Sequence, residues 1–286
     1  MKFIFTFIAI LLTIKASAQE NQALKIITFN IRYDNPDDGA NSWENRKEEV
    51  FTFLNKEKPD LWGGQEVLHH QLQDILIGLP EYDFIGVGRE NGKTKGEYSP
   101  IFFDKSKISL VRNGTFWLSN TPNKVASVGW DAALERITTW GIFTVKATGQ
   151  EVAVFNTHFD HVGKIARMKS ADLILKKIKE IAKDKPIVLM GDFNVTENSE
   201  ALEGIKDSPG FSLAKKMAGN ISGPDWSFHD FGDLPMNKRN LIDHIFVNQC
   251  IKVLDYHNIF EKQDAPFLSD HNPIMINVLI DCKHEK

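Results

Sequence analysis

Acidic and amide side chains follow several apolar segments of the chain, at the points where strands are expected to end. One example is the run Gly191-Asp192-Phe193-Asn194, which directly follows the apolar residues 187–190. Because side chains alternate along a strand with a period of two, Asp192 and Asn194 are expected on the same face. Comparable positions are held by Asn30, Glu66 and the adjacent pair Asp270 and His271. Hydrolysis of a phosphoester needs a hard cation, an activated water molecule and help for the leaving oxygen, and this set of residues predicts that chemistry.

Oxygen-bearing side chains are the ligands that Mg²⁺ prefers, and one or two carboxylates plus an amide are sufficient because the ion keeps several waters. Glu66 lies at the end of the segment Gly63-Gly64-Gln65-Glu66-Val67, where a solvated acid is the alternative interpretation. Asn30 interrupts an apolar strand and could instead satisfy a turn. Asp270 precedes the last apolar segment, where aspartate is often only a cap.

Histidine is the usual proton carrier near neutral pH, so the position of His271 beside Asp270 favours a catalytic role. A histidine in that role needs a carboxylate that fixes its tautomer. Asp243, in Leu241-Ile242-Asp243-His244, offers one from another strand. The neighbouring His244 is expected to be structural.

A second group of polar residues surrounds the strand that ends at His158. Asn156 precedes His158 by two positions and shares its face, which makes Asn156 a candidate substrate ligand, and His161 is expected at the rim of the site. Arg136 could hold a phosphate oxygen or form a surface ion pair. Glu97 could orient His158 or remain a solvated acid.

Short β-like segments recur along the chain, and amphipathic helical patterns interleave them. The expected strands are residues 24–31, 60–67, 82–87, 99–103, 108–116, 138–146, 151–157, 187–190, 241–248, 253–257 and 272–279. Two helices are expected in the first third of the chain, one of them at residues 43–56, and a long one at mid-chain, at residues 163–183. No long linker or internal repeat follows residue 22, so residues 19–286 are expected to form one α/β domain.

The N-terminus has the pattern of a secretory signal peptide. Lys2 precedes an apolar run over residues 3–14, and Ala16-Ser17-Ala18 fits a cleavage site before Gln19. An uncleaved N-terminal anchor is the alternative, although the run is short for a membrane span. We therefore expect export to the periplasm or beyond. In an exported protein Cys250 and Cys282 could form a disulfide, but the sequence leaves their pairing open.

The formal net charge of the 286-residue chain is −4, and it becomes −6 after residues 1–18 are removed, because two lysines and no acid are lost. This acidic balance lacks the basic footprint of a dedicated nucleic-acid binder. No P-loop motif and no serine nucleophile elbow are present, which excludes those two hydrolytic mechanisms. Four tryptophans near the candidate loops could form a ligand wall or only pack: Trp43, Trp117, Trp130 and Trp226.

The order of the motifs resembles the endonuclease/exonuclease/phosphatase superfamily across residues 24–280. The motifs are Phe-Asn-Ile-Arg, Gln-Glu, Asn-Thr-His, Gly-Asp-Phe-Asn, Ile-Asp-His and Ser-Asp-His. The resemblance implies a four-layer α/β sandwich, in which two mainly antiparallel sheets are flanked by helices and the site lies at one sheet edge. Residues 129–133 are similar to a bacterial exported subgroup, and the chain is closer to the deoxyribonuclease and sphingomyelinase branches than to the repair nucleases.

The resemblance also implies roles for individual residues. Asn30, Glu66 and Asp270 correspond to metal ligands for Mg²⁺, for which Mn²⁺ could substitute. Asp192 corresponds to the acid that orients or deprotonates water, and Asn194 to a group that stabilises the transition state. His271, supported by Asp243, corresponds to the histidine that contacts the scissile phosphate, either as a base or as a hydrogen-bond donor to the phosphoryl oxygens. His158 is a candidate donor to the leaving oxygen, with Glu97 as its orienting acid.

Three functions are compatible with a chain of this kind. We expect a phosphoesterase that acts on a small-molecule or lipid-derived monoester or diester and that needs no obligate protein partner, as a monomer. A secreted nuclease is the alternative, and the acidic charge argues against it. A non-catalytic binding module is disfavoured because Asp192, His271 and Glu66 are all retained.

Overall fold

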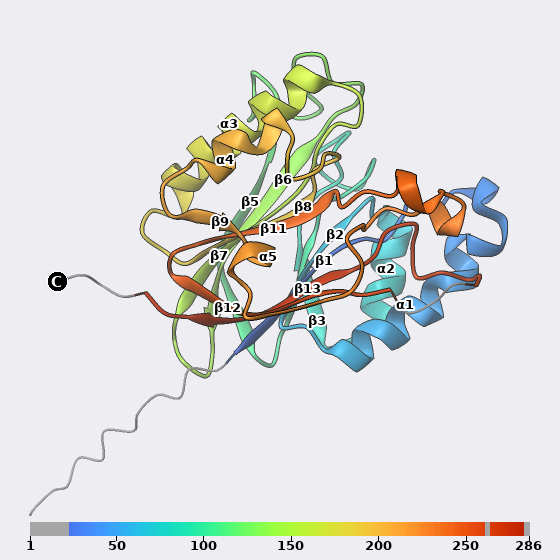
Figure 1. Ribbon diagram of the computed structural model, residues 1–286, viewed down its shortest axis with the longest axis horizontal. Helices are drawn as coiled ribbons and strands as arrows, with labels where there is room; N and C mark the ends of the chain where they lie inside the picture. The colour runs from blue at the N-terminus through green and yellow to red at the C-terminus, as the bar shows by residue number, and fades with distance from the viewer. Residues whose placement is uncertain (1–22, 261–263, 283–286) are drawn as a thin grey trace, which may run out of the picture.

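The computed structural model describes residues 23–260 and 264–282 (Figure 1). The expected signal peptide at residues 1–18 lies outside these described residues. Two β-sheets pack face to face, and helices cover their outer faces, as the resemblance implied. The seven-stranded sheet has the order β10 (Asn220–Ser222), β12 (Ile251–Asn258), β13 (Ile274–Ile280), β1 (Leu24–Asn30), β2 (Leu61–Gln65), β4 (Ile101–Asp104), β3 (Tyr82–Ile85). The six-stranded sheet has the order β5 (Ile108–Trp117), β6 (Ile137–Val145), β7 (Glu151–His158), β8 (Ile187–Asp192), β11 (Asp243–Asn248), β9 (Phe211–Leu213).

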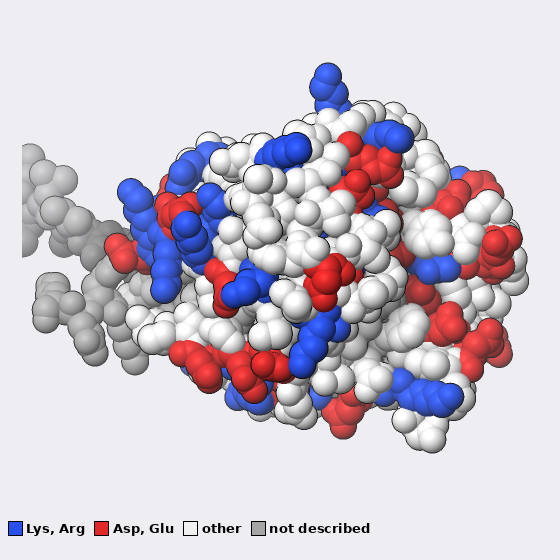
Figure 2. All heavy atoms as spheres, turned by 90° about the horizontal axis from the view of Figure 1, so that it is seen from above, with Lys and Arg blue, Asp and Glu red and all other residues white. Residues whose placement is uncertain are grey.

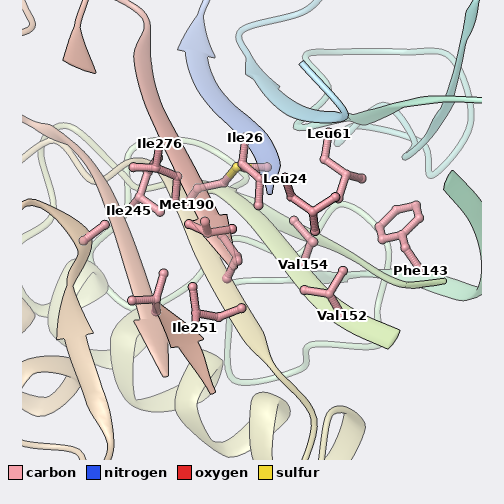
Figure 3. Packing of buried hydrophobic residues seen from close by; sticks show 14 of the residues in the cluster. Leu24, Ile26, Leu61, Phe143, Val152, Val154, Met190, Ile245, Ile251 and Ile276 are labelled. Carbon is pink, nitrogen blue, oxygen red and sulfur yellow. The ribbon is translucent and has the colours of Figure 1, made fainter. Parts of the chain in front are cut away.

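The inner faces of the two sheets form the central core. Ile26 and Leu61 from one sheet point toward Val154 and Met190 from the other (Figure 3), and all four side chains are fully buried. β-branched and other apolar residues suit such positions because both inner faces are removed from water. This core therefore fixes the spacing between the two sheets.

Helices complete the outer layers of the sandwich (Figure 1). α1 (Trp43–Glu57) and α2 (His69–Gly78) pack their apolar residues against the seven-stranded sheet. α3 (Lys164–Ile181) covers the six-stranded sheet, together with the short α4 (Glu203–Lys206). α5 (Ala214–Met217) follows β9 directly. None of the helices within the described residues combines the length and apolar character that crossing a membrane requires.

Most sheet neighbours are antiparallel, and three pairs are parallel: β1 with β2, β7 with β8, and β10 with β12. Strands β13 and β11 run antiparallel to β1 and β8. The starts of β13 and β11 therefore lie at the same edge as the ends of β1, β2, β7 and β8. This edge is where the sequence places its chemically active side chains.

The expected elements agree with the structure except in details. The helix expected at 163–183 is α3, and the strand expected at 241–248 begins two residues later, at Asp243. The second helix expected in the first third of the chain is α2, whose bounds were not predicted, whereas the short strands β9 and β10 were not expected. These elements are too short to show a clear periodicity, and packing against the sheets stabilises them.

The two cysteines form a disulfide, which answers the question that the sequence left open. Cys250 lies just before β12 and Cys282 just after β13. The bridge joins these two neighbouring antiparallel strands at the end opposite the candidate site.

Candidate active site

The expected catalytic side chains come from both sheets and converge at one edge of the sandwich. Asn30 ends β1, and Glu66 follows β2 with a left-handed φ of 61°. His158 and Asp192 end the parallel neighbours β7 and β8, where they are register partners. Asp243 begins β11 and is the register partner of Asp192. Asp270 and His271 directly precede β13. The order of the strands thus explains why residues far apart in sequence meet.

Asp192 lies at the centre of this group and is almost completely buried. Its Oδ1 accepts a hydrogen bond from the backbone N–H of Asn194 at 2.8 Å, and its Oδ2 accepts one from Asn30 Nδ2 at 3.1 Å. The same Asn30 nitrogen donates to Glu66 Oε1 at 3.1 Å. Burial and then the negative charge of Asp243 raise the pKa of Asp192 to about 7.

The turn after β8, and not the strand period, brings Asn194 into the site. β8 ends at Asp192, and Asn194 adopts a left-handed φ of 53°. Asparagine tolerates this conformation better than most residues. Asp192 and Asn194 do lie together, as expected. The reason given for it, a shared strand face, is wrong. Gly191 permits the close pairing of β7 and β8, because a Cβ there would lie 2.0 Å from the Thr157 carbonyl oxygen.

His271 and Asp243 form a buried hydrogen-bonded pair. His271 Nδ1 lies 2.8 Å from Asp243 Oδ2, and the same oxygen accepts a hydrogen bond from Ser227 Oγ at 2.6 Å. His271 Nε2 faces Asp192 Oδ2 at 3.8 Å. Burial alone would lower the pKa of His271, but the carboxylates of Asp243 and Asp192 raise it well above its ordinary value. His271 is therefore held as a cation that points into the site.

His158 is placed in the opposite electrostatic environment. Burial lowers its pKa well below the ordinary value, and the positive charges of Arg136 and Arg89 act in the same direction. Asn194 Nδ2 lies 3.1 Å from His158 Nε2 and donates to the Phe159 carbonyl at 3.0 Å. A nitrogen that accepts from this amide carries no proton, so the arrangement assigns the proton of the neutral ring to Nδ1.

Glu97 lies on the Nδ1 side of His158, as the resemblance implied. The distance from Glu97 Oε2 to Nδ1 is 3.9 Å, which is too long for a hydrogen bond. Burial raises the pKa of Glu97, and Arg89 opposes that rise through two contacts of 2.8 Å. The hydroxyl of the next residue, Tyr98, is not directed at His158, because it donates to the Lys93 carbonyl at 2.8 Å.

Two residues that support this site were not recognised in the sequence, Arg89 and Ser227. Arg89 and Glu97 face each other across a loop in which the Arg89 N–H also donates to the Glu97 carbonyl at 3.0 Å. Their opposite charges on either side of Gly92 and Gly96 are a signal that could have suggested the pair. Ser227 lies in a connection without any periodic pattern, and no sequence signal identifies it.

Arg136 is buried and does not form the surface ion pair that was one alternative. Its Nε lies 3.6 Å from Asp160 Oδ2, and its Nη2 lies 3.1 Å from Nδ1 of the exposed His161. Arg136 Nε and Nη1 are buried without a hydrogen-bond partner among the described residues. Asp160 is itself held by four backbone N–H groups, those of Ala133, Leu134, Val162 and Gly163. Arg136 thus remains a candidate for binding an anionic group next to His158.

Asn156 joins the two sheets, which contradicts the expected role in substrate binding. Its Nδ2 donates to the carbonyls of Gly64 at 2.7 Å and Pro100 at 2.8 Å. Its Oδ1 accepts from Gln65 Nε2 at 2.6 Å. Both amide hydrogens are therefore used inside the protein, and the side chain is fully buried. Asn156 supports the site from below and does not reach a substrate.

The residues expected to bind a metal ion fit that role in their chemistry. Asp270 is buried, and its pKa is raised to about 6: burial and the negative charge of Glu66 raise the pKa, while the positive charge of His271 opposes the rise. A divalent cation would relieve this repulsion between carboxylates. In the present rotamer Asn30 directs its nitrogen toward the acids, so its amide would have to turn to offer oxygen.

A second group could also hold a metal ion. Asp192, Asp243 and His271 each offer a ligand atom, and these atoms lie within 4.8 Å of one another. His271 Nδ1 and Asp243 Oδ2 are already committed to each other, whereas Asp243 Oδ1 is buried without a hydrogen-bond partner in the described residues. A metal ion there would require His271 to lose the proton from Nε2, whereas the carboxylates of Asp243 and Asp192 favour the protonated ring.

The four tryptophans have different surroundings. Trp43 belongs to the buried core and donates to Asp74 at 2.9 Å, so it is not part of a ligand wall. Trp117 is also buried, and its indole donates to the Arg89 carbonyl at 2.7 Å. Trp130 and Trp226 are half-buried. His244 is structural as expected, since it is buried and its Nε2 lies 2.9 Å from the Val195 carbonyl.

Known proteins share this sequence pattern and fold. The profile of the endonuclease/exonuclease/phosphatase family matches residues 27–271. A Bacteroides vulgatus endonuclease/exonuclease/phosphatase is 46% identical, with a TM-score of 0.89, over 91% of this chain and 100% of that one. The Bacteroides thetaiotaomicron mannosyl-6-phosphatase is 36% identical, with a TM-score of 0.84, over 90% and 99% of the two chains. An uncharacterized protein of Acanthamoeba polyphaga mimivirus is 26% identical over 257 residues, which is 82% of this chain and 91% of that protein.

The matched range therefore includes every acid and histidine of the site, up to His271 itself. The chain belongs to the endonuclease/exonuclease/phosphatase family and is a hydrolase of phosphoesters.

Proposed function

We propose that the protein is an exported, Mg²⁺-dependent phosphomonoesterase that releases inorganic phosphate from a small phosphorylated molecule, with a sugar phosphate as the favoured substrate. The observation that carries this proposal is the convergence of Asp192, the His271–Asp243 pair and Glu66 at one edge of the sandwich. This arrangement supplies an acceptor for a proton, a cationic donor and a carboxylate for a cation.

The chain's own groups divide the reaction among them. Asp192 keeps acceptor capacity after its two hydrogen bonds, so it can orient a water molecule and take its proton as the water oxygen bonds to phosphorus. His271, fixed by Asp243, directs its Nε2–H at the phosphoryl oxygens and stabilises the charge that develops on them. A divalent cation at Glu66 and Asp270 would add positive charge that polarises the phosphoryl group.

The protonation states of the two histidines decide which of them can give a proton to the leaving oxygen. As the ester P–O bond breaks, the leaving oxygen must gain a proton. A neutral His158 with an unprotonated Nε2 has no proton to give from that atom, which argues against the donor role suggested by the resemblance. His271 is the ring that carries a proton on the nitrogen facing the site, so we assign the proton donation to His271.

Two observations support a small phosphomonoester over a nucleic acid. The similarity to a mannosyl-6-phosphatase extends over 90% of the chain at 36% identity. The described face that Figure 2 displays has Lys and Arg interspersed with Asp and Glu, and no continuous basic strip runs across it. A nuclease needs such a strip to follow the phosphate backbone.

Export is supported by the N-terminal pattern and by the disulfide. The apolar run at residues 3–14 and the small residues before Gln19 are typical of a signal peptide. Disulfides persist in oxidising compartments such as the periplasm, and Cys250 is paired with Cys282. Detection of the mature N-terminus at Gln19 in the periplasmic or secreted fraction tests this part of the proposal.

The activity is tested with purified protein and a panel of hexose phosphates, 5′-nucleotides, bis-nitrophenyl phosphate, sphingomyelin and DNA. Release of inorganic phosphate from a hexose phosphate, abolished by Asp192→Asn, is the expected result. Cleavage of DNA or of the diester alone would contradict the phosphomonoesterase proposal.

A further inference from the structure

A hollow lined by aromatic side chains lies beside the catalytic pair, and none of the catalytic steps proposed for the site uses it. It has a volume of about 470 Å³ and lies between the segment that precedes β11 and the segment that precedes β13. Its walls include Trp226, Met236, Arg239, Phe260 and Phe267. Small-molecule sites commonly have a volume in this range, with a few polar groups among aromatic side chains.

The hollow is connected to the catalytic pair through the segment that contains Trp226. The next residue, Ser227, donates to Asp243, and the ring of Phe228 lies 4.9 Å from that of His271. A smaller cavity shares Phe260 and Phe267 with the hollow and has His271 in its wall. Phe260 and Phe267 therefore link the hollow to the cavity that the His271 ring lines.

The polar groups of the hollow are held in place before any ligand binds. The Arg239 guanidinium lies over the Trp226 ring at 4.6 Å. Arg239 Nε donates to the Leu234 carbonyl at 2.8 Å, and Nη2 donates to the Gly232 carbonyl at 2.9 Å. Neither Arg239 Nη1 nor the Trp226 indole N–H donates to another residue within 23–260 and 264–282, and both groups belong to side chains that line the hollow.

The ring geometry favours a puckered ligand over a planar one. Trp226 meets Phe260 at an interplanar angle of 71° and the neighbouring His229 at 69°. These rings lie edge to face, so they offer no pair of parallel faces between which a nucleobase could stack. A sugar ring instead packs its C–H groups on aromatic faces and directs its hydroxyls to donors. Among the described lining residues Arg239 carries the only formal charge, and that positive charge attracts a phosphorylated substrate.

We propose that this hollow binds the sugar ring of a hexose phosphate while its phosphoryl group lies between Asp192 and His271. Trp226 and Arg239 are the residues that determine this specificity. The inference rests on the proposed phosphomonoesterase function and adds the part of the molecule that recognises the sugar. Water and the ester are converted to inorganic phosphate and the free sugar, whose hydroxyl oxygen takes the proton.

The test compares mannose 6-phosphate, methyl phosphate and adenosine 5′-monophosphate as substrates of wild type, Trp226→Ala and Trp226→Phe. Methyl phosphate carries the same scissile group but cannot fill the hollow. In Trp226→Ala the ratio of kcat/KM for mannose 6-phosphate to that for methyl phosphate should fall about tenfold, mainly through KM, because one apolar pocket contact typically discriminates by this order. The ratio for Trp226→Phe should lie between those for wild type and Trp226→Ala.

Trp140→Ala is the matched control, since Trp140 is also half-buried beneath an arginine, Arg112, at 5.5 Å, but outside the site. Its substrate ratio should equal that of wild type. Calorimetric binding of mannose 6-phosphate to Asp192→Asn, with and without Trp226→Ala, gives a readout that does not depend on turnover. Trp226→Ala should weaken this binding about tenfold.

Different failures are distinguishable. If wild type hydrolyses methyl phosphate and the Trp226 variants do not change the ratio, the hollow is not a sugar site and the phosphomonoesterase proposal stands. A ratio that changes only for adenosine 5′-monophosphate overturns the sugar assignment in favour of a base. If no phosphomonoester is hydrolysed, the proposed function is wrong. If Trp226→Ala also leaves the calorimetric binding of mannose 6-phosphate unchanged, the hollow is excluded as a sugar site.

Discussion

The hydrogen bond between His271 and Asp243 gives the most direct prediction, because a nearly isosteric change removes only its charge. In Asp243→Asn the side chain keeps its shape at a fully buried position. The amide can still accept from Ser227, but it offers His271 a neutral oxygen or an N–H in place of a carboxylate. We expect the proton of His271 to be lost or to move to the wrong ring nitrogen, so that the Nε2–H no longer faces the phosphoryl group.

The size of the effect follows from the contacts. His271 Nδ1 lies 2.8 Å from Asp243 Oδ2, and this is a charge-assisted bond in a buried environment. Such bonds contribute about 3 kcal/mol at most. If all of this is lost in the transition state, kcat falls roughly 10²-fold. KM should change little, because the group acts on the charge that develops during the reaction.

The assay is steady-state hydrolysis of p-nitrophenyl phosphate at pH 7 with saturating Mg²⁺, combined with circular dichroism and thermal unfolding to confirm the fold. Asp255→Asn is the control, since Asp255 on β12 likewise accepts two side-chain hydrogen bonds, from the amides of Asn220 at 2.9 Å and Asn277 at 3.3 Å, away from the site. Its kcat should match wild type. A folded Asp243→Asn protein whose kcat stays within about threefold of wild type would refute the catalytic role of the His271–Asp243 pair.

Three further predictions concern other parts of the molecule. Replacing Arg89 by Met leaves Glu97 buried without its cation, so the free energy of unfolding in urea should fall by about 3 kcal/mol; an unchanged urea midpoint would contradict the buried pair. Exhaustive chelation should abolish phosphate release and added Mg²⁺ should restore it, and full activity of the chelated protein would exclude a metal-dependent mechanism. His229 has a pKa of about 3, lowered by burial, so its neutral form is the folded one and stability is lost as pH falls below the unfolded value of 6.5. Between pH 8 and pH 5 wild type should therefore lose about 2 kcal/mol more than His229→Asn, whose side chain keeps an acceptor for the Gly232 N–H; equal losses would contradict this assignment.

The strand-end positions of the site could be predicted from the sequence because they depend on local patterns. Apolar runs with polar residues at their ends mark Asn30, Glu66, His158 and Asp192 without any knowledge of the topology. The convergence of these residues could be expected only from the resemblance, since periodicity does not tell which strands are neighbours. The order β13-β1-β2 in one sheet and β7-β8-β11 in the other provides the physical reason.

The supporting residues could not be predicted, because they lie in connections whose conformation depends on tertiary contacts. Ser227 reaches Asp243 only when the segment before β11 packs against the start of β13. Asn156 was misjudged for a related reason. Asn156 and His158 share a strand face that is turned toward the opposite sheet. His158, at the end of the strand, reaches the site. Asn156 lies two positions deeper, where its amide meets backbone carbonyls of the opposite sheet instead.

The position of Asn156 also explains how the geometry of the site is maintained. Glu66 belongs to one sheet and Asp192 to the other, so their separation depends on the distance between the sheets. Directly beneath them Asn156 donates to Gly64 and Pro100 of the opposite sheet's segments, and a Cβ at Gly63 would lie 2.6 Å from its Cγ. Three buried hydrogen bonds therefore fix the spacing at the edge where the acids meet, whereas an apolar contact alone would allow the sheets to slide. The polar layer beneath the site thus holds the acids and histidines in register with one another.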